Sequence, residues 1–201
     1  MNAGARGTAV YDTNLKIETA RLLLRQPRLE ELDDWSSFML DAESMRFIGG
    51  VQPRLSVWRF LMTAVGSWAT MGFGMFSVFD RRSGVWLGRV GPIKPAGWPG
   101  TEVGWSIRRE YWRQGYALEA ASAVIDWAFD NLNWGDVIHC IAPENVGSQS
   151  VARRLGSVNR GPGRLPAPLD QEPADIWGQT RAQWRVNRRS LGSSRHEQVA
   201  T

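Results

Sequence analysis

A strand, a glycine-containing turn and a helix follow one another between residues 103 and 129, and this segment constrains the fold most. Val103, Trp105 and Ile107 alternate at period two, which predicts a strand. After Gly115, one helical stripe carries Leu118, Ala121, Ile125 and Ala128 or Phe129. The first N–H groups of a helix lack partners and favour a bound phosphate, and glycine lets the backbone approach it closely. The segment therefore predicts a pyrophosphate-binding turn, although ordinary helix entry is the simpler interpretation of one glycine taken alone.

Two further elements after this helix make the phosphate interpretation more specific. A short apolar strand is predicted at 137–141, and a helix capped by Asn145 and ended by Gly156 follows it. In this order the chain resembles the Gcn5-related N-acetyltransferase (GNAT) family, in particular its RimJ/RimL branch of ribosomal-protein N-terminal acetyltransferases. The resemblance covers roughly residues 17 to 185, with branch-like segments at 18–25, 102–105 and 145–156. The family's turn pattern, Arg/Gln-x-x-Gly-x-Gly/Ala, falls on residues 112–117, where Trp112 replaces the usual Arg or Gln.

The resemblance implies an α/β (α+β) fold, with a mixed, mostly antiparallel sheet whose splayed central strands are flanked by helices. It also implies that acetyl-CoA is the cofactor, with its pantetheine arm lying in the gap between the strands at 103–107 and 137–141. Buried backbone amides need partners, which an amide-bearing arm would supply. The residues expected to bind the cofactor are Trp105, Ser106, Ile107, Arg113, Gln114, Gly115, Tyr116, Ala117, Asn145 and Ser148. For Asn145, a plain helix cap is the alternative.

Acetyl transfer to an amine needs a base, because an amine with a pKa near about 10 is mostly protonated at neutral pH. We expect Glu102 to be this base, since it opens the central strand and shares one face with Gly104 and Ser106. An exposed edge-strand carboxylate is the alternative for Glu102, and Glu119 is the rival base or a residue that complements the helix dipole.

Two more catalytic groups are expected from the resemblance. The oxyanion donor would be a backbone N–H near Trp105 to Ile107. Many relatives place a tyrosine acid where this chain has Ala152, so Ser148, Ser150, a water or no acid would protonate the leaving thiolate. Cys140 is a poor candidate for an acyl-carrying nucleophile, because it lies in an apolar strand without a neighbouring cation.

Aromatic and apolar residues in the predicted loops and strands are candidates for the acceptor site. The chain has eleven tryptophans, and those within helical stripes are expected in the core. The residues expected to bind the acceptor are Phe47, Ile48, Trp98, Glu102 and Trp177. Core packing remains the alternative for the aromatic members. The Pro-rich loops at 92–100 and 161–173 favour a partly covered pocket for a primary amine slightly over an open groove for a protein N-terminus.

Composition narrows the classes of partner. The 201 residues carry a net charge of +4 and a pI near 9.8, which raises nucleic acid as a partner, but the basic residues are scattered and nucleic acid is not expected. The sequence has no run of eighteen apolar residues and no basic-then-apolar leader, so we expect no membrane span and a cytoplasmic location. A single cysteine and two histidines predict neither a disulfide nor a metal site. An exposed Trp-rich face would favour a homodimer.

The domain organisation is expected to be simple. Residues 1–15 mix small and polar residues without periodicity and predict a flexible arm, residues 16–187 form one acetyltransferase domain, and residues 188–201 predict a disordered tail. Helices are expected at 29–40 and 56–70, a hairpin at 75–90 and a final strand pair near 157–159 and 175–179.

Three functions remain open at this point. The leading one is an acetyl-CoA-dependent N-acetyltransferase that acts on a primary amine by direct attack on the thioester. The second is a catalytically silent acyl-CoA-binding module on the same fold, which the missing tyrosine makes plausible. The third is a basic RNA- or ribosome-associated protein, which steep salt dependence of RNA binding would support.

Overall fold

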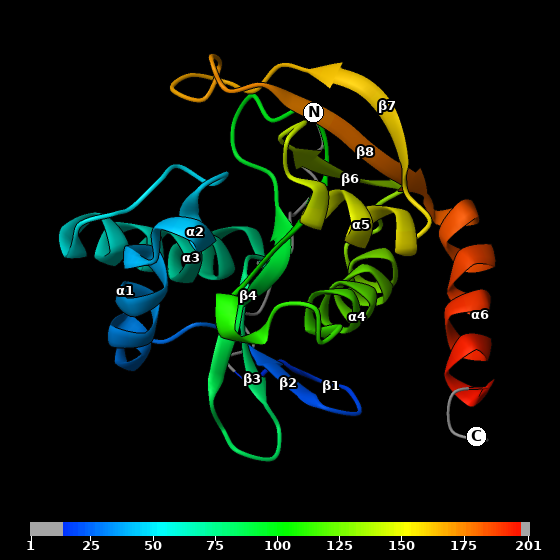
Figure 1. Ribbon diagram of the computed structural model, residues 1–201, viewed down its shortest axis with the longest axis horizontal. Helices are drawn as coiled ribbons and strands as arrows, with labels where there is room; N and C mark the ends of the chain where they lie inside the picture. Colours follow the sequence, from blue (N-terminus) through cyan, green and yellow to red (C-terminus); the bar gives the residue numbers. More distant parts are fainter. Residues whose placement is uncertain (1–13, 198–201) are drawn as a thin grey trace, which may run out of the picture.

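The structure is a computed structural model that describes residues 14–197 and contains one continuous sheet with helices on both faces (Figure 1). Its strands are β1 (Lys16–Glu18), β2 (Leu22–Arg25), β3 (Phe76–Asp80), β4 (Trp86–Ile93), β5 (Glu102–Ile107), β6 (Asp136–Ile141), β7 (Val158–Gly163) and β8 (Ala174–Thr180). Its helices are α1 (Leu32–Leu40), α2 (Ala42–Met45), α3 (Arg54–Met71), α4 (Tyr116–Asn131), α5 (Val146–Arg154) and α6 (Arg181–Glu197). Short 3-10 turns, η1 (Leu29–Glu31) and η2 (Arg109–Tyr111), precede α1 and follow β5.

The sheet has the strand order β1-β2-β3-β4-β5-β6-β8-β7, and every neighbouring pair except β5 and β6 is antiparallel. This confirms the expected mixed, mostly antiparallel sheet. The one parallel pair requires a crossover, which α4 provides. β5 and β6 are therefore joined through the helix that begins at the predicted phosphate turn.

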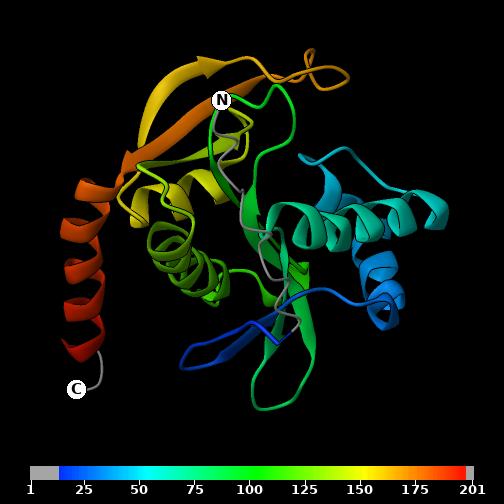
Figure 2. The same cartoon turned by 180° about the vertical axis from the view of Figure 1, so that it is seen from behind.

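Two apolar layers hold the helices against the sheet. On one face, α4 packs its buried residues Ala120, Ala121, Val124 and Ile125 against the central strands. On the other face, α1 and α3 pack against Trp86 of β4 through Trp35, Phe38, Val57 and Leu61. Figures 1 and 2 show α1 to α3 together on one side of β4 and α4 on the other. The sheet thus separates α4 from the group formed by α1, α2 and α3 on the opposite face.

Most elements expected from periodicity occur within a few residues of their predicted positions, and the C-terminal segment is the main difference. The arm expected at 1–15 falls largely on residues 1–13, which lie outside the described residues. The disordered tail is expected from Arg188, whereas the structure continues α6 from Arg181 to Glu197. Trp184 donates its indole N–H to Asp126 of α4 at 2.8 Å, and Arg188 Nε donates to the same carboxylate at 2.8 Å. These contacts with α4 stabilise a helix whose polar composition does not predict one.

Gly88 is a point at which the β4–β5 pairing excludes any side chain. Its φ is +152°, and a Cβ built there would lie 2.2 Å from the Ser106 carbonyl oxygen. We expect Gly88→Ala to lower the free energy of unfolding by about 3 kcal/mol or more, because backbone must move in a central strand pair. Gly84, in the hairpin turn at φ +73°, has open space around its Cβ position. Gly84→Ala should cost only about 1 kcal/mol, and urea unfolding that ranks the two variants the other way would contradict this reading.

Candidate active site

The central feature of the site is the point at which β5 and β6 separate. The two strands pair only at Glu102 and Ile138, next to the bond from the Ile138 N–H to the Thr101 carbonyl at 2.9 Å. Beyond this point, side chains replace the main-chain ladder. The Glu102 carboxylate accepts from the Cys140 N–H at 3.1 Å, and His139 Nδ1 lies 2.7 Å from the Val103 carbonyl oxygen. The expected splay of the central strands is confirmed.

The splay leaves main-chain groups of β5 directed at the gap. Successive residues of a strand direct their N–H and C=O groups to opposite neighbours. Because the carbonyls of Thr101 and Val103 point to β6, those of Trp105 and Ile107 point the same way. Ile107 also accepts from the Trp112 indole N–H at 2.6 Å, which joins the end of β5 to the turn before α4.

Glu102 is a buried carboxylate that accepts hydrogen bonds from Trp98 and from both the main chain and the thiol of Cys140. Trp98, from the loop before β5, donates its indole N–H to Oε2 at 2.5 Å, and the Cys140 N–H binds Oε1. Burial raises the pKa of Glu102, and the bonds from Cys140 and Trp98 only partly oppose the increase. A Cβ at Gly104 would find only Glu102 Oε1 nearby, at 3.7 Å. The carboxylate therefore borders open space over Gly104, and the alternative of an exposed edge carboxylate is excluded by its burial.

The turn before α4 has the backbone geometry of an anion site. Arg113 has φ +60° and Gly115, the N-cap, has φ +80°, and no side chain caps the helix. The first N–H groups of α4 therefore keep their capacity to bind an external acceptor. Arg113 and Gln114 are exposed, while Tyr116 and Ala117 are half-buried at the helix start. A pyrophosphate fits this arrangement, because glycine removes the side chain that would otherwise stand at the cap.

Glu119, the rival base, is committed to holding the turn in place. Its carboxylate accepts from the Thr19 hydroxyl at 2.6 Å and from Arg21 Nε at 2.7 Å. Arg21 also donates to the Gln114 carbonyl at 2.9 Å. Burial acts to raise the pKa of Glu119, but the bonds from Thr19 and Arg21 outweigh it and leave the pKa below its ordinary value. A carboxylate held ionised by this ion pair is suited to a structural role.

Helix α5 places two predicted residues at its start and an alanine at the position where the family resemblance implies a tyrosine. Asn145 Oδ1 caps the helix by accepting from the Ser148 N–H at 3.0 Å. Ser148 is half-buried and lies one turn before Ala152 on the same side of the helix. Ala152 is fully buried and packs with Ile141 and Trp177. An aromatic side chain thus does occupy this region, but it comes from β8.

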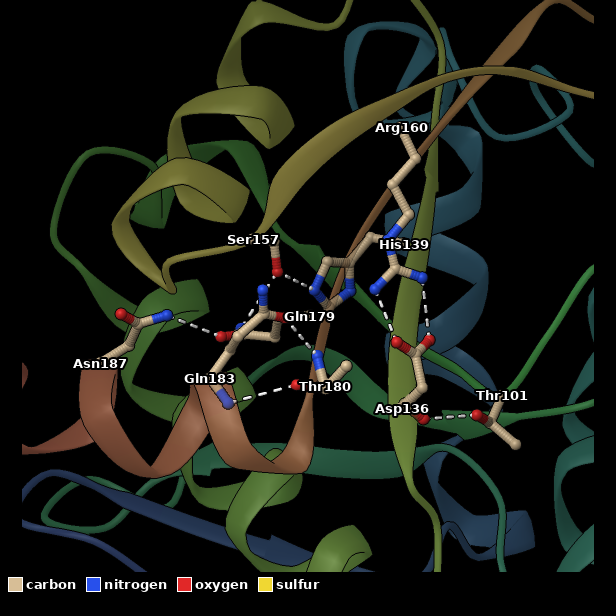
Figure 3. Close-up of polar contacts among 9 residues, drawn as sticks. All are labelled: Thr101, Asp136, His139, Ser157, Arg160, Gln179, Thr180, Gln183 and Asn187. Atoms are coloured by element: carbon tan, nitrogen blue, oxygen red, sulfur yellow. Dashed lines mark hydrogen bonds and ion pairs between the residues drawn. The ribbon is translucent and has the colours of Figure 1, made fainter.

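His139 is the centre of a buried polar network that the sequence did not suggest (Figure 3). Its Nε2 lies 3.1 Å from the Ser157 hydroxyl, which also accepts from Gln179 Nε2 at 3.1 Å. Asn187 of α6 donates to Gln179 Oε1 at 3.0 Å. Because the Val103 carbonyl can only accept, we assign the proton of the neutral ring to Nδ1 and the Ser157 proton to the bond with Nε2. Burial lowers the pKa of His139 to about 4.

The remaining predicted residues are placed as follows. Trp177 is buried, with the Arg153 guanidinium 5.0 Å from its ring, and Trp105 lies 4.7 Å from the His139 ring. Phe47 lies under Arg46 at 5.1 Å, and Ile48 is exposed. Trp98 is thus brought to Glu102, whereas the assignment of Phe47 and Ile48 to the acceptor wall stays a prediction.

The one signal for His139 in the sequence was a polar residue at an alternating position of an otherwise apolar strand.

The part of the chain that the structure describes shows neither a metal site nor a membrane-spanning helix. Residues 14–197 contain no group of three or more His, Cys, Asp or Glu side chains arranged to hold a metal ion. In the same range, no helix is long and apolar enough to cross a membrane.

Comparison with known proteins gives a consistent picture. The model of the acetyltransferase (GNAT) domain family matches residues 21–158. An uncharacterized N-acetyltransferase, YnaD of Bacillus subtilis, is 29% identical over 151 residues, which cover 73% of this chain and 85% of that protein. The crystal structure of an acetyltransferase from Agrobacterium tumefaciens is similar with a TM-score of 0.73 and 26% identity, covering 86% of this chain and 98% of that one. A ribosomal-protein-S5-alanine acetyltransferase from Vibrio fischeri, at 19% identity and a TM-score of 0.68, covers 85% of this chain and 99% of its own and shares the fold.

The low pKa of His139 makes a prediction about stability. The folded pKa of about 4 lies below the ordinary value of 6.5, so the unfolded chain binds more protons between these values. The free energy of unfolding should therefore fall as the pH drops from 6.5 to 4, by up to about 3 kcal/mol from this residue. His139→Asn should flatten this part of the pH profile in urea unfolding. Carboxylates also titrate in this range, but they are the same in the wild type and the variant. Identical dependence of the unfolding free energy on pH in the two proteins would therefore contradict the low pKa of His139.

Proposed function

The chain belongs to the GNAT family and is an N-acetyltransferase, and from this we propose that it transfers an acetyl group from acetyl-CoA to a primary amine by direct attack on the thioester. The observation that carries the proposal is the position of buried Glu102 at the separation of β5 and β6. The same gap leads from Glu102 along Trp105 and Ile107 to the uncapped start of α4. The proposed base, the strand gap and the proposed phosphate turn thus follow one another along β5 and the turn after it.

The residues along this line fit acetyl-CoA. The αL conformation of Gly115 and the absence of a side-chain cap on α4 leave its first N–H groups for a pyrophosphate. The main-chain groups of Trp105 and Ile107 would pair with the amides of the pantetheine arm. Ser106, Tyr116 and Ala117 border these groups, and Arg113, Gln114, Asn145 and Ser148 would add polar contacts. Acetyl-CoA supplies an activated acetyl group, and the chain's own residues must supply orientation and proton transfer.

Glu102 would accept the amine proton. Its raised pKa brings it closer to the pH at which a carboxylate is an efficient base. The open space over Gly104, 3.7 Å from Oε1, leaves room for an amine or an intervening water. The Trp105 N–H, directed to the gap, would stabilise negative charge on the carbonyl oxygen. Because Ala152 carries no proton, Ser148 or a water would protonate the leaving thiolate.

A covalent acyl-cysteine route has little support. Burial raises the pKa of Cys140, and the neighbouring Glu102 carboxylate raises it further. The thiolate is the reactive form of cysteine, and this site disfavours it. Direct transfer to the amine is therefore the simpler mechanism.

The acceptor is proposed as a primary amine, with a protein N-terminus as the closest alternative within this class. Trp98 binds Glu102 directly, so the loop at 92–100 partly covers the base and favours an enclosed acceptor. The RimJ/RimL assignment also belongs to this proposal. Its support is the shared fold with the ribosomal-protein acetyltransferase from Vibrio fischeri, which leaves the acceptor of this chain open.

The cofactor turn can be tested with Gly115→Asp. The new carboxylate would stand at the helix start and repel phosphate, so the Kd for acetyl-CoA should rise about 100-fold or more in calorimetry. Gly84→Asp is the matched control, since Gly84 has a similar φ of +73° in the hairpin turn away from α4. If the folded Gly115 variant keeps wild-type affinity, the turn is not the phosphate site.

The base can be tested with Glu102→Gln in an assay of free thiol release with a panel of amines. The turnover number should fall about 100-fold or more, with acetyl-CoA affinity near wild type, because glutamine cannot accept the proton. The acidic limb of the wild-type pH–rate profile, which lies above the ordinary pKa of 4.5, should disappear with it.

Glu119→Gln is the control for this assignment. It removes the acceptor of Thr19 and Arg21, so it should lower the melting temperature more than the turnover number. If Glu119→Gln loses turnover while Glu102→Gln keeps it, Glu119 is the base and Glu102 has the structural role. Turnover with any amine excludes a catalytically silent module.

A further inference from the structure

Arg89 places a positive charge on the face of the sheet that is opposite α4. It lies in the central strand β4, directly across from Ser106 of β5 and Ser77 of β3. Its guanidinium is 5.1 Å from the ring of Trp35, so the side chain points toward α1. The residue is half-buried, although its Nε is shielded from solvent.

Unpaired hydrogen-bond donors gather around this guanidinium. Arg89 Nε, Trp35 Nε1 and Trp86 Nε1 are all shielded from solvent and have no hydrogen-bond partner among the described residues. The ring centroids of Trp35 and Trp86 lie 6.2 Å apart, and the Arg89 guanidinium lies 5.1 Å from the Trp35 ring, so the side chains that carry these donors are neighbours. Buried donors are rarely left unpaired in folded proteins. A cluster of donors with one positive charge indicates a missing anionic acceptor.

Two carboxylates on the same side of the sheet, Glu31 and Asp41, already have partners. Glu31 is held by Arg25, by the Ser77 hydroxyl and by the Arg28 N–H. Asp41 accepts from the Ser44 N–H at 2.7 Å and forms an ion pair with Arg109 at 3.2 Å. The structure gives Arg89 no ion pair within residues 14–197. Burial lowers the pKa of Arg89 to about 10, and no charge among the described residues offsets this desolvation.

Arg89 shares a face of the sheet with the proposed base. Ser106, Gly104 and Glu102 of β5 lie opposite Arg89, Gly91 and Ile93 of β4. Glu102 and Ser106 are four residues apart, roughly 13 Å along the strand, and Gly104 between them leaves open space. The side chains of Glu102 and Arg89 cover part of this span. A ligand joining them would have several bonds between its two ends.

We propose that Arg89 binds a carboxylate of the acceptor, so that the preferred acceptor is a primary amine that carries a carboxylate several bonds away. The guanidinium would form charge-assisted hydrogen bonds with the carboxylate, with the Trp35 indole N–H beside it. The amine end would then lie over Gly104, next to Glu102. This inference rests on the proposed function for the identity of the amine site, whereas the anion site itself stands on the unpaired donors.

The activity test compares carboxylates with their uncharged amides. The probes are β-alanine, 4-aminobutanoate and 5-aminopentanoate, each paired with its primary amide, in the thiol-release assay. The wild type should favour at least one carboxylate over its amide, and Arg89→Met should reduce that kcat/KM ratio about 30-fold or more. The ratio for Arg89→Lys should lie between those of the wild type and Arg89→Met, because lysine keeps the charge but lacks the planar guanidinium. Arg59→Met, at an exposed arginine of α3, should keep the wild-type ratio.

A binding test separates this inference from the proposed function. At constant ionic strength, the same carboxylates should raise the melting temperature of the wild type but not of Arg89→Met, because only the folded wild type binds them. In the absence of ligand, Arg89→Met should melt at the same or a higher temperature, since it removes an uncompensated buried charge. Equal thermal shifts in both proteins, or acetylation without any preference for carboxylates, would overturn the inference and leave amine acetylation standing. Thermal shifts without acetylation of any amine would support the anion site and count against the proposed function.

Discussion

The separation of β5 from β6 after a single parallel pair is the constraint on which the site depends. Two side chains hold the separated strands where main-chain bonds would otherwise form: Glu102 binds the Cys140 N–H, and His139 binds the Val103 carbonyl. These contacts satisfy polar groups at the start of the gap, as buried backbone requires. They also leave the main chain of Trp105 and Ile107 directed to an open edge. The same carboxylate that spaces the strands is the proposed base, so architecture and chemistry share one residue.

Glu102 and Glu119 are both buried, but their surroundings shift their pKa values in opposite directions. The hydrogen-bond donors to Glu102, from Trp98 and Cys140, are neutral, and burial raises its pKa. Glu119 has the Arg21 guanidinium as well as the Thr19 hydroxyl, and its pKa is lowered. A full positive charge stabilises the ionised form, whereas burial disfavours it. The first glutamate is thereby suited to accept a proton, and the second to hold the proposed phosphate turn against the turn between β1 and β2.

The two faces of the sheet differ in how completely their charges are paired. On the side of α4, Arg21, Arg181 and Arg188 each meet a carboxylate. On the side of α1, Arg89 and two indole N–H groups are left without acceptors among the described residues. A partly buried cation without an ion-pair partner is costly to stability, and such costs concentrate where ligands bind. The asymmetry is consistent with a cofactor held largely by backbone on one side and a charged acceptor recognised by side chains on the other.

Local sequence pattern determined many of the helices and strands of this protein, whereas long-range contacts decided the roles of several side chains. Period-two alternation at Val103, Trp105 and Ile107, the helical stripe after Gly115 and the cap at Asn145 were readable from the sequence, because each depends on residues within a few positions of one another. The roles of Glu119 and His139 were not, since their partners lie at Thr19 and Arg21, about a hundred positions earlier, and at Val103 and Ser157. Helix α6 was missed for the same reason: Trp184 and Arg188 are ordered by Asp126 of α4. A sequence shows which groups a chain carries, whereas burial and pairing, which set their charge states, exist only once distant segments have packed.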